Sequence, residues 1–105
     1  MRYAIVINLD YESNGYDECH ELWTLITQRM VEAGFRLEGR LFTIEMPPSE
    51  ACEHARRIIE EVNRSLGSVD RDVFTYLKEF YGYDHTRTVN LLLPSSENFE
   101  IREGP

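Results

Sequence analysis

The sequence predicts an α+β fold in which two helices cover one face of an antiparallel-rich sheet. Three observations lead to this prediction. An apolar, β-branched run near the start is typical of a buried strand, two longer segments repeat apolar residues at helical spacing, and short alternating stretches are bounded by Gly and Pro. The 105 residues suit one domain, which we place at residues 1–94 with a tail at residues 95–105.

The first strand is the segment around which we expect the fold to be organised. The run RYAIVINLD at Arg2–Asp10 is too short for a lone helix, and its nearly unbroken apolar character indicates a strand with neighbours. Asn8 and Asp10 stand two residues apart at its end, which places both on one strand face. The C-terminal end of a central strand is a frequent place for chemistry, so we expect any functional site there.

The first helix follows a turn-forming loop in which Asn14 or Asp17 can act as N-cap. Gly34 falls just past the end of the apolar stripe, where a left-handed C-terminal cap requires glycine, and Phe35 can fold back on the last turn. The stripe itself recurs at spacings of three and four and consists of Cys19, Leu22, Ile26, Met30 and Ala33.

The middle of the chain predicts two short strands, or one bent strand, and then a second helix. Residues 35–46 alternate with a break near Gly39-Arg40, and Pro47-Pro48 ends the sheet because proline cannot donate to a ladder. Ser49 is the expected N-cap of the helix and Gly67 its expected end. The inner stripe of this helix is Ala51, Ala55, Ile58, Ile59, Val62 and Leu66.

The last third of the domain is ambiguous at residues 72–81, which fit either a strand or a helix stripe. The aromatic and β-branched residues favour a strand. Residues 82–84 then form a turn, residues 88–93 a last strand that ends at Pro94, and residues 99–101 a possible short edge strand. This order is the ferredoxin-like βαββαβ arrangement with an extra C-terminal strand. Because its second sheet face has no helix to cover it, we expect a homodimer.

Composition restricts the classes of function. Eleven basic and nineteen acidic residues give a net charge of −8, which disfavours non-specific nucleic-acid binding but leaves room for a local basic patch. Two cysteines fit buried free thiols in a reducing cytosol, and with His20 and His54 they lack the spacing of a standard zinc motif. No apolar run approaches the roughly 18 residues of a membrane span, and we find no positively charged leader followed by an apolar segment in the sequence. We therefore expect a cytoplasmic protein without membrane contact.

With these elements, the chain resembles the small CRISPR-associated endonuclease or integration-scaffold family, and equally the virulence-associated protein D ribonucleases, which share that fold. The resemblance extends from Tyr3 to Leu93. It includes the first strand with its polar end, the helix end at Ala33-Gly34-Phe35, and Arg40-Leu41-Phe42 before a short strand and the second helix. It implies a homodimer in which the last strand pairs with the partner's sheet. It also implies that an aspartate late in the first strand meets its symmetry mate and holds a divalent metal.

The alignment of Tyr3–Ile7 with the opening run of that family places Asn8 at the aspartate position, and Asp10 follows two residues later. An amide brings no negative charge, whereas Mg²⁺ prefers carboxylate oxygens, so either Asp10 has taken over the role or the metal site is lost. Asn8 and Asp10 can also simply cap loops. Arg40 could contact a phosphate, which Glu38 would oppose. Asn8, Tyr11 and Arg40 are the candidate contacts to nucleic acid or ligand; Asp10 with Asn8 are the candidate metal ligands.

Three functional hypotheses follow. The preferred one is a non-catalytic or degenerate nuclease that acts as a binding or scaffold protein, with RNA or a protein as its partner. The second is a Mg²⁺-dependent endoribonuclease that uses Asp10 at the dimer axis as its catalytic residue. The third is a dimeric sensor of a small ligand. Only the second requires a cofactor, which is Mg²⁺.

Overall fold

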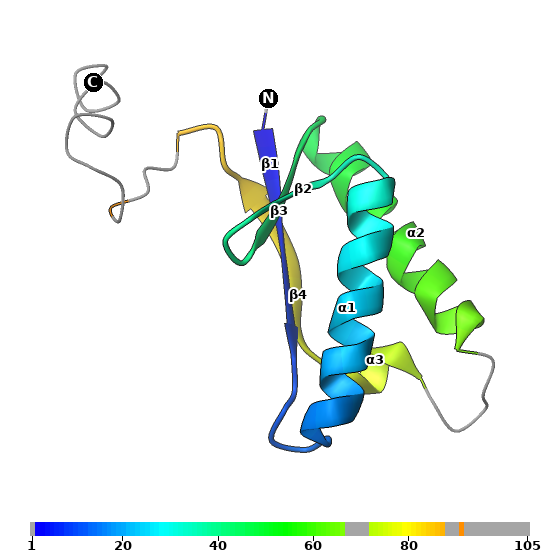
Figure 1. Ribbon diagram of the computed structural model, residues 1–105. Helices are drawn as coiled ribbons and strands as arrows, with labels where there is room; N and C mark the ends of the chain where they lie inside the picture. Colours follow the sequence, from blue (N-terminus) through cyan, green and yellow to red (C-terminus); the bar gives the residue numbers. More distant parts are fainter. Residues whose placement is uncertain (1, 67–71, 88–90, 92–105) are drawn as a thin grey trace.

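The computed structural model describes residues 2–66, 72–87 and 91, and within them it has a four-stranded antiparallel sheet with its helices on one side (Figure 1). The strand order is β2-β3-β1-β4, which is the ferredoxin-like order, so the predicted α+β fold class is confirmed. The predicted strand at residues 99–101 and the tail lie outside the described residues, as does the predicted strand at residues 88–93 except for the exposed Leu91. In chain order the elements are β1 (Arg2–Leu9), α1 (Tyr16–Glu32), β2 (Arg36–Glu38), β3 (Leu41–Glu45), α2 (Pro48–Ser65), α3 (Val73–Tyr76) and β4 (Leu77–Asp84).

Strand β1 lies inside the sheet, between β3 and β4, as its apolar run predicted. Ile5, Ile7 and Leu9 belong to the buried core cluster that includes residues of both long helices. The two neighbouring strands pair with different lengths of β1. The pairing with β3 ends at Val6, whereas the pairing with β4 continues to Leu9. The last residues of β1 therefore have a strand on one side only.

Helix α1 ends as predicted but begins differently. Gly34 has a φ of 105°, and the amides of Gly34 and Phe35 donate to the carbonyls of Val31 and Met30, both at 3.0 Å. These two bonds make a Schellman motif, which satisfies carbonyls that the end of the helix leaves open. The predicted N-caps are wrong because Gly15 precedes the first helical residue without a side-chain cap. The side-chain Nδ2 of Asn14 instead donates to the backbone carbonyl of Asp10 at 3.0 Å.

Helix α2 buries the predicted stripe against the sheet and α1. The N-cap at Ser49 is wrong. Pro47 is the capping residue and Pro48 starts the helix, where the fixed φ of proline suits the first turn. His54 Nε2 donates to the carbonyl of Ala33 at 3.0 Å, because a carbonyl can only accept, and so ties α2 to the end of α1. Gly67 lies outside the described residues.

The segment from residue 72 to residue 84 corrects the predicted strand. Its first part is the short helix α3, whose N-terminus is capped by Asp72 Oδ1, which accepts from the amide of Phe74 at 3.0 Å. Strand β4 begins only at Leu77 and continues through the residues predicted as a turn. Gly82 is part of this strand and pairs with Ile5. The backbone is packed closely here, since a Cβ at Gly82 would lie 2.5 Å from the ring of Tyr3. Within the described part of the chain, no helix is apolar over a length that would cross a membrane.

Candidate functional site

A groove of about 430 Å³ lies at the C-terminal end of β1. It opens where β3 has stopped pairing with β1, so that residues 7–9 of β1 face β4 on one side and the groove on the other. We call it the β1-end groove. Strand β1, the loop that follows it, α1 and the β2–β3 hairpin all contribute to its lining, which consists of Ile7, Asn8, Leu9, Tyr11, Trp23, Leu37, Gly39 and Arg40.

The β1-end groove brings together three residues that the sequence singled out. Asn8 comes from β1, Tyr11 from the loop after it, and Arg40 from the turn between β2 and β3. Tyr11 is 44 % exposed. Gly39 has a φ of 65°, a left-handed conformation that suits glycine, and it forms the tight turn that carries the exposed Arg40. The groove thus combines an amide, an aromatic ring and a guanidinium above an apolar floor.

Asp10 does not line the groove, and its carboxylate is engaged with its own loop. Asp10 Oδ1 accepts hydrogen bonds from the amides of Glu12 and Ser13, both at 3.1 Å. Hydrogen bonding from Ser13 is the main cause that lowers the pKa of Asp10 below its usual value, so the group is an anion at neutral pH. The geometry is that of the loop-capping interpretation, in which Asp10 shapes the turn that carries Tyr11.

Asn8 and Asp10 do not share a regular strand face. Strand β1 ends at Leu9, and its register with β4 shifts between Asn8 and Leu9, so the two-residue repeat does not extend to Asp10. Asn8 Nδ2 donates to Glu79 Oε1 on β4 at 2.7 Å. Across residues 2–66, 72–87 and 91, no three His, Cys, Asp or Glu side chains gather in a way that could hold a metal ion.

The carboxylate of Glu38 is paired with Arg2 and Thr43, although the sequence suggested that its charge would oppose the binding of a phosphate to Arg40. This carboxylate forms an ion pair with Arg2 at 3.0 Å and accepts a hydrogen bond from the Thr43 hydroxyl. The Thr43 bond and then the bond from Arg2 lower the pKa of Glu38. The charge of Glu38 is therefore balanced by Arg2, and Arg40 is left to face the groove.

A row of rings next to the groove, exposed except for the half-buried Trp23, was missed at the level of the sequence. Tyr11 and Tyr16 have ring centroids 5.7 Å apart, and Tyr16 stacks on His20 at 5.8 Å with an interplanar angle of 6°. Trp23 follows on the same face of α1 because residues 16, 20 and 23 are four and three apart. We call Tyr11, Tyr16, His20 and Trp23 the aromatic row. The helical spacing of its α1 members was the signal that could have revealed it.

The two cysteines are free thiols in this structure. Cys19 is fully buried, and burial is the main cause that raises the pKa of its thiol. His20 and His54 stack on Tyr16 and Phe35, respectively, so the cysteines and histidines do not gather as a zinc site.

Comparison with known proteins adds no relative: no protein-family model matches the chain, and the search of curated proteins finds no match. The resemblance to the CRISPR-associated and virulence-associated families therefore stays a prediction from the sequence.

Proposed function

We propose that this protein is a non-catalytic binding or scaffold module that holds a protein partner in the β1-end groove. One observation supports this most directly. Tyr11, Trp23 and Arg40 meet at the groove, whereas the carboxylate of Asp10 is bound to its own loop. Tyrosine, tryptophan and arginine are the side chains enriched at the energetic centres of protein interfaces.

The charges around the groove indicate the chemistry of the partner. The net charge of −8 repels nucleic acid and favours encounter with a basic protein. Asp17, Glu18 and Glu21 are exposed on the turns of α1 that carry Tyr16 and His20. The partner segment should therefore present an apolar side chain to the floor of the groove and place Lys or Arg near the first turns of α1.

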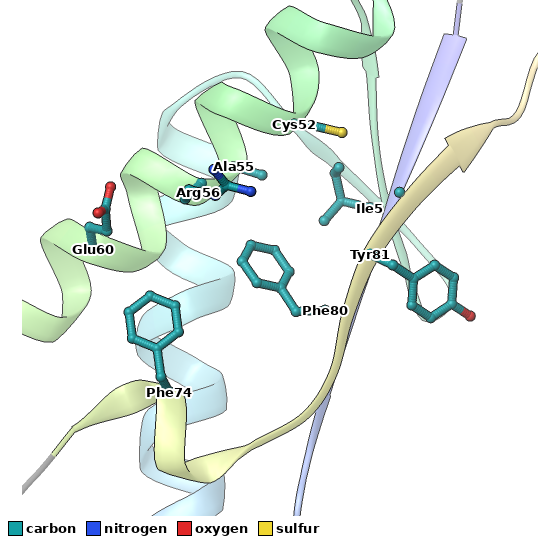
Figure 2. A pocket seen from close by; sticks show the side chains of 9 residues that line it. Ile5, Cys52, Ala55, Arg56, Glu60, Phe74, Phe80 and Tyr81 are labelled. Atoms are coloured by element: carbon teal, nitrogen blue, oxygen red, sulfur yellow. The ribbon is translucent and has the colours of Figure 1, made fainter.

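The predicted homodimer forms part of this proposal. Helices α1 and α2 cover one face of the sheet, and within the described residues no helix lies on the other face (Figure 1). On that helix-free face Val6 pairs with Leu41 on one side and Tyr81 on the other. Tyr81 is 50 % exposed and points away from α2 (Figure 2), which gives a second copy an apolar contact. Sedimentation at increasing protein concentration measures the dimer, and Tyr81→Glu should weaken it.

A displayed library of random peptides tests the groove directly. We expect selection on the full-length protein to enrich peptides in which Lys or Arg surround an apolar residue. Tyr11→Ala and Arg40→Gln should each weaken the binding of these peptides, while Arg64→Gln, a change of an exposed arginine on α2, should not. Enriched peptides that bind all variants equally, or the failure to enrich any peptide, would refute the proposed site.

The second candidate is the Mg²⁺-dependent endoribonuclease. It is favoured by the lowered pKa of Asp10, which keeps the carboxylate charged, and by the fact that both of its backbone hydrogen bonds go to Oδ1. A cleavage assay on single-stranded RNA with and without Mg²⁺ separates the two candidates. We expect no metal-dependent cleavage. Cleavage that is lost in Asp10→Ala but kept in the control Asp17→Ala would replace the scaffold proposal.

A further inference from the structure

A second cavity lies on the other side of β1, between α2 and the edge strand β4 (Figure 2). Its volume is about 210 Å³, and it shares no lining residue with the β1-end groove. We call it the α2–β4 pocket. Ile5 and Ala55 form a buried floor at 1 % and 0 % exposure, Phe80 is a half-buried wall, and Phe74 stands at the rim.

The pocket is apolar inside and charged at its mouth. Figure 2 shows the rings of Phe74 and Phe80 turned toward α2, and Arg56 extended from α2 toward β4. Glu60 also lines the mouth, but its carboxylate is directed away from the strand (Figure 2). A guanidinium at the entrance of an apolar cavity is suited to a carboxylate, which it can bind through two parallel N–H donors.

Arg56 differs from its neighbour Arg57 in having no acidic partner within the described chain. Arg57 forms an ion pair with Glu53 at 3.6 Å along the outer face of α2. Arg56 has no ion pair among the described residues, although Glu60 stands one turn away. Other described arginines also lack an ion pair, so what distinguishes Arg56 is its position at the mouth of an apolar cavity, where an anionic ligand would supply a partner charge.

We propose that the α2–β4 pocket binds a small monocarboxylate with an aromatic or branched aliphatic body. The body packs between Ile5, Ala55 and Phe80, and the carboxylate pairs with Arg56. Drug-sized ligands occupy pockets of about 300–1,000 Å³, so a ligand of this smaller pocket is correspondingly smaller. Glu60 at the mouth disfavours a second negative charge on the ligand. This site does not depend on the function proposed for the groove.

Cys52 supplies a reporter inside the pocket. It is partly exposed and lines the cavity, with Sγ 3.7 Å from the Tyr3 hydroxyl, whereas Cys19 is fully buried. A thiol reagent should therefore reach Cys52 first, and a bound ligand should shield it.

The probe is 3-phenylpropionate, compared with its uncharged amide, on the full-length protein. We expect the acid to slow the labelling of Cys52 by N-ethylmaleimide, which peptide mass spectrometry measures. The acid should give the same protection at about a tenfold lower concentration than the amide, because a hydrogen bond to a charged group strengthens binding by about that factor. Arg56→Gln should remove this preference, and the matched variant Arg57→Gln should keep it. Titration calorimetry with the same probe gives the affinities without the thiol.

Each outcome decides the proposal. A preference for the acid that disappears only in Arg56→Gln supports it. Equal effects of the acid and the amide, equal losses in the two arginine variants, or the absence of heat and protection with the acid overturn it. Phenylalanine serves as a further arm. If it binds more tightly than the acid, the ligand class is a zwitterion and the monocarboxylate proposal is wrong. Circular dichroism confirms that each variant is folded.

Discussion

The two halves of strand β1 have the same apolar character but opposite surroundings. Residues 3–6 pair with β3 on one side and β4 on the other, and Arg2 pairs with β3. Residues 7–9 keep β4 but have lost β3, and the β1-end groove opens in its place. The comparison teaches that the length of the neighbouring strand β3, rather than the residues of β1, decides where the groove opens in this sheet.

The polar contacts of β1 also differ between its first half, residues 2–6, and its second half, residues 7–9. On the helix-free face, Arg2 in the first half of β1 pairs with Glu38 at 3.0 Å and so links β1 to β2 across the sheet. Beyond the second half, Asp10 holds the following loop and Asn8 binds Glu79 on β4. The polar contacts of the first half thus link strands, whereas those near the second half fix Asn8 and the loop beside the groove that we propose as the binding site.

The largest expected effect is a loss of stability from the first half of β1. Ile5→Ala should lower the free energy of unfolding by about 2–5 kcal/mol, because its side chain is 1 % exposed and its truncation leaves a cavity where β1 has a strand on both sides, although the α2–β4 pocket also reaches this side chain. Leu9→Ala should cost less, because water and side chains can enter from the groove and relax the site. Urea unfolding of both variants measures the difference. If Leu9→Ala costs more than Ile5→Ala, the two halves do not differ as proposed.

A smaller effect is expected where the first half of β1 meets β4. A Cβ at Gly82 would lie 2.5 Å from the Tyr3 ring, 3.0 Å from the Ile5 side chain and 3.2 Å from the Ala4 carbonyl oxygen. Gly82→Ala should therefore cost about 1–3 kcal/mol through overpacking. Gly15→Ala is the matched control, since a Cβ there meets its nearest neighbour at 3.6 Å. Similar unfolding midpoints for the two variants would contradict the close packing at Gly82.

Gly82 also shows why sequence reasoning misplaced one strand. A Gly-Tyr-Asp sequence is a local turn signal, but these residues pair with β1, which is far away in the sequence, and the ring of Tyr3 occupies the space of the missing side chain. Residues 73–76 were ambiguous for a different reason. Val73 and Tyr76 are buried at a spacing of three, and the helix is selected by the Asp72 cap and by Asn63 Oδ1, which accepts from the amide of Val73 at 2.8 Å.

Apart from the N-caps of the two long helices, which were wrong, the elements up to α2 followed from local signals. The stripe of each long helix, the Gly34 cap and the bend at Gly39-Arg40 all lie where the spacing predicted. The site was only partly predictable. The position of Asn8, Tyr11 and Arg40 around one groove depends on where β3 stops, and the engagement of Asp10 by its own loop depends on the end of β1 at Leu9. Neither boundary is marked by a proline or glycine in β1 itself.

The polar link across the first half predicts a dependence of stability on pH. Hydrogen bonds from Thr43 and then from Arg2 lower the pKa of Glu38 in the folded state. The ionised carboxylate therefore stabilises the fold at pH values above its unfolded pKa of about 4.3. This stabilisation is lost as the pH falls through the folded pKa. Glu38→Gln should cost about 1 kcal/mol at neutral pH, the size of a hydrogen bond, and should make the acid limb of the stability curve shallower. Thermal melts from pH 7 to acid measure both. Glu53→Gln, on the exposed face of α2, is the control, and an acid limb that stays equally steep in Glu38→Gln would contradict the role of this link.

The smallest effect on stability is expected in the second half, at the groove itself. Arg40 is exposed on a turn, Gly39 already supplies the left-handed backbone conformation there, and a change of the arginine side chain leaves that backbone untouched. Arg40→Gln should therefore change the free energy of unfolding by no more than about 0.5 kcal/mol, while it weakens the peptides selected on the groove. Paired measurement of unfolding and peptide affinity on one preparation tests this separation. A loss of stability similar to that of Glu38→Gln would mean that Arg40 holds the hairpin in place, and the difference between a stabilising half and a ligand-facing half of β1 would no longer stand.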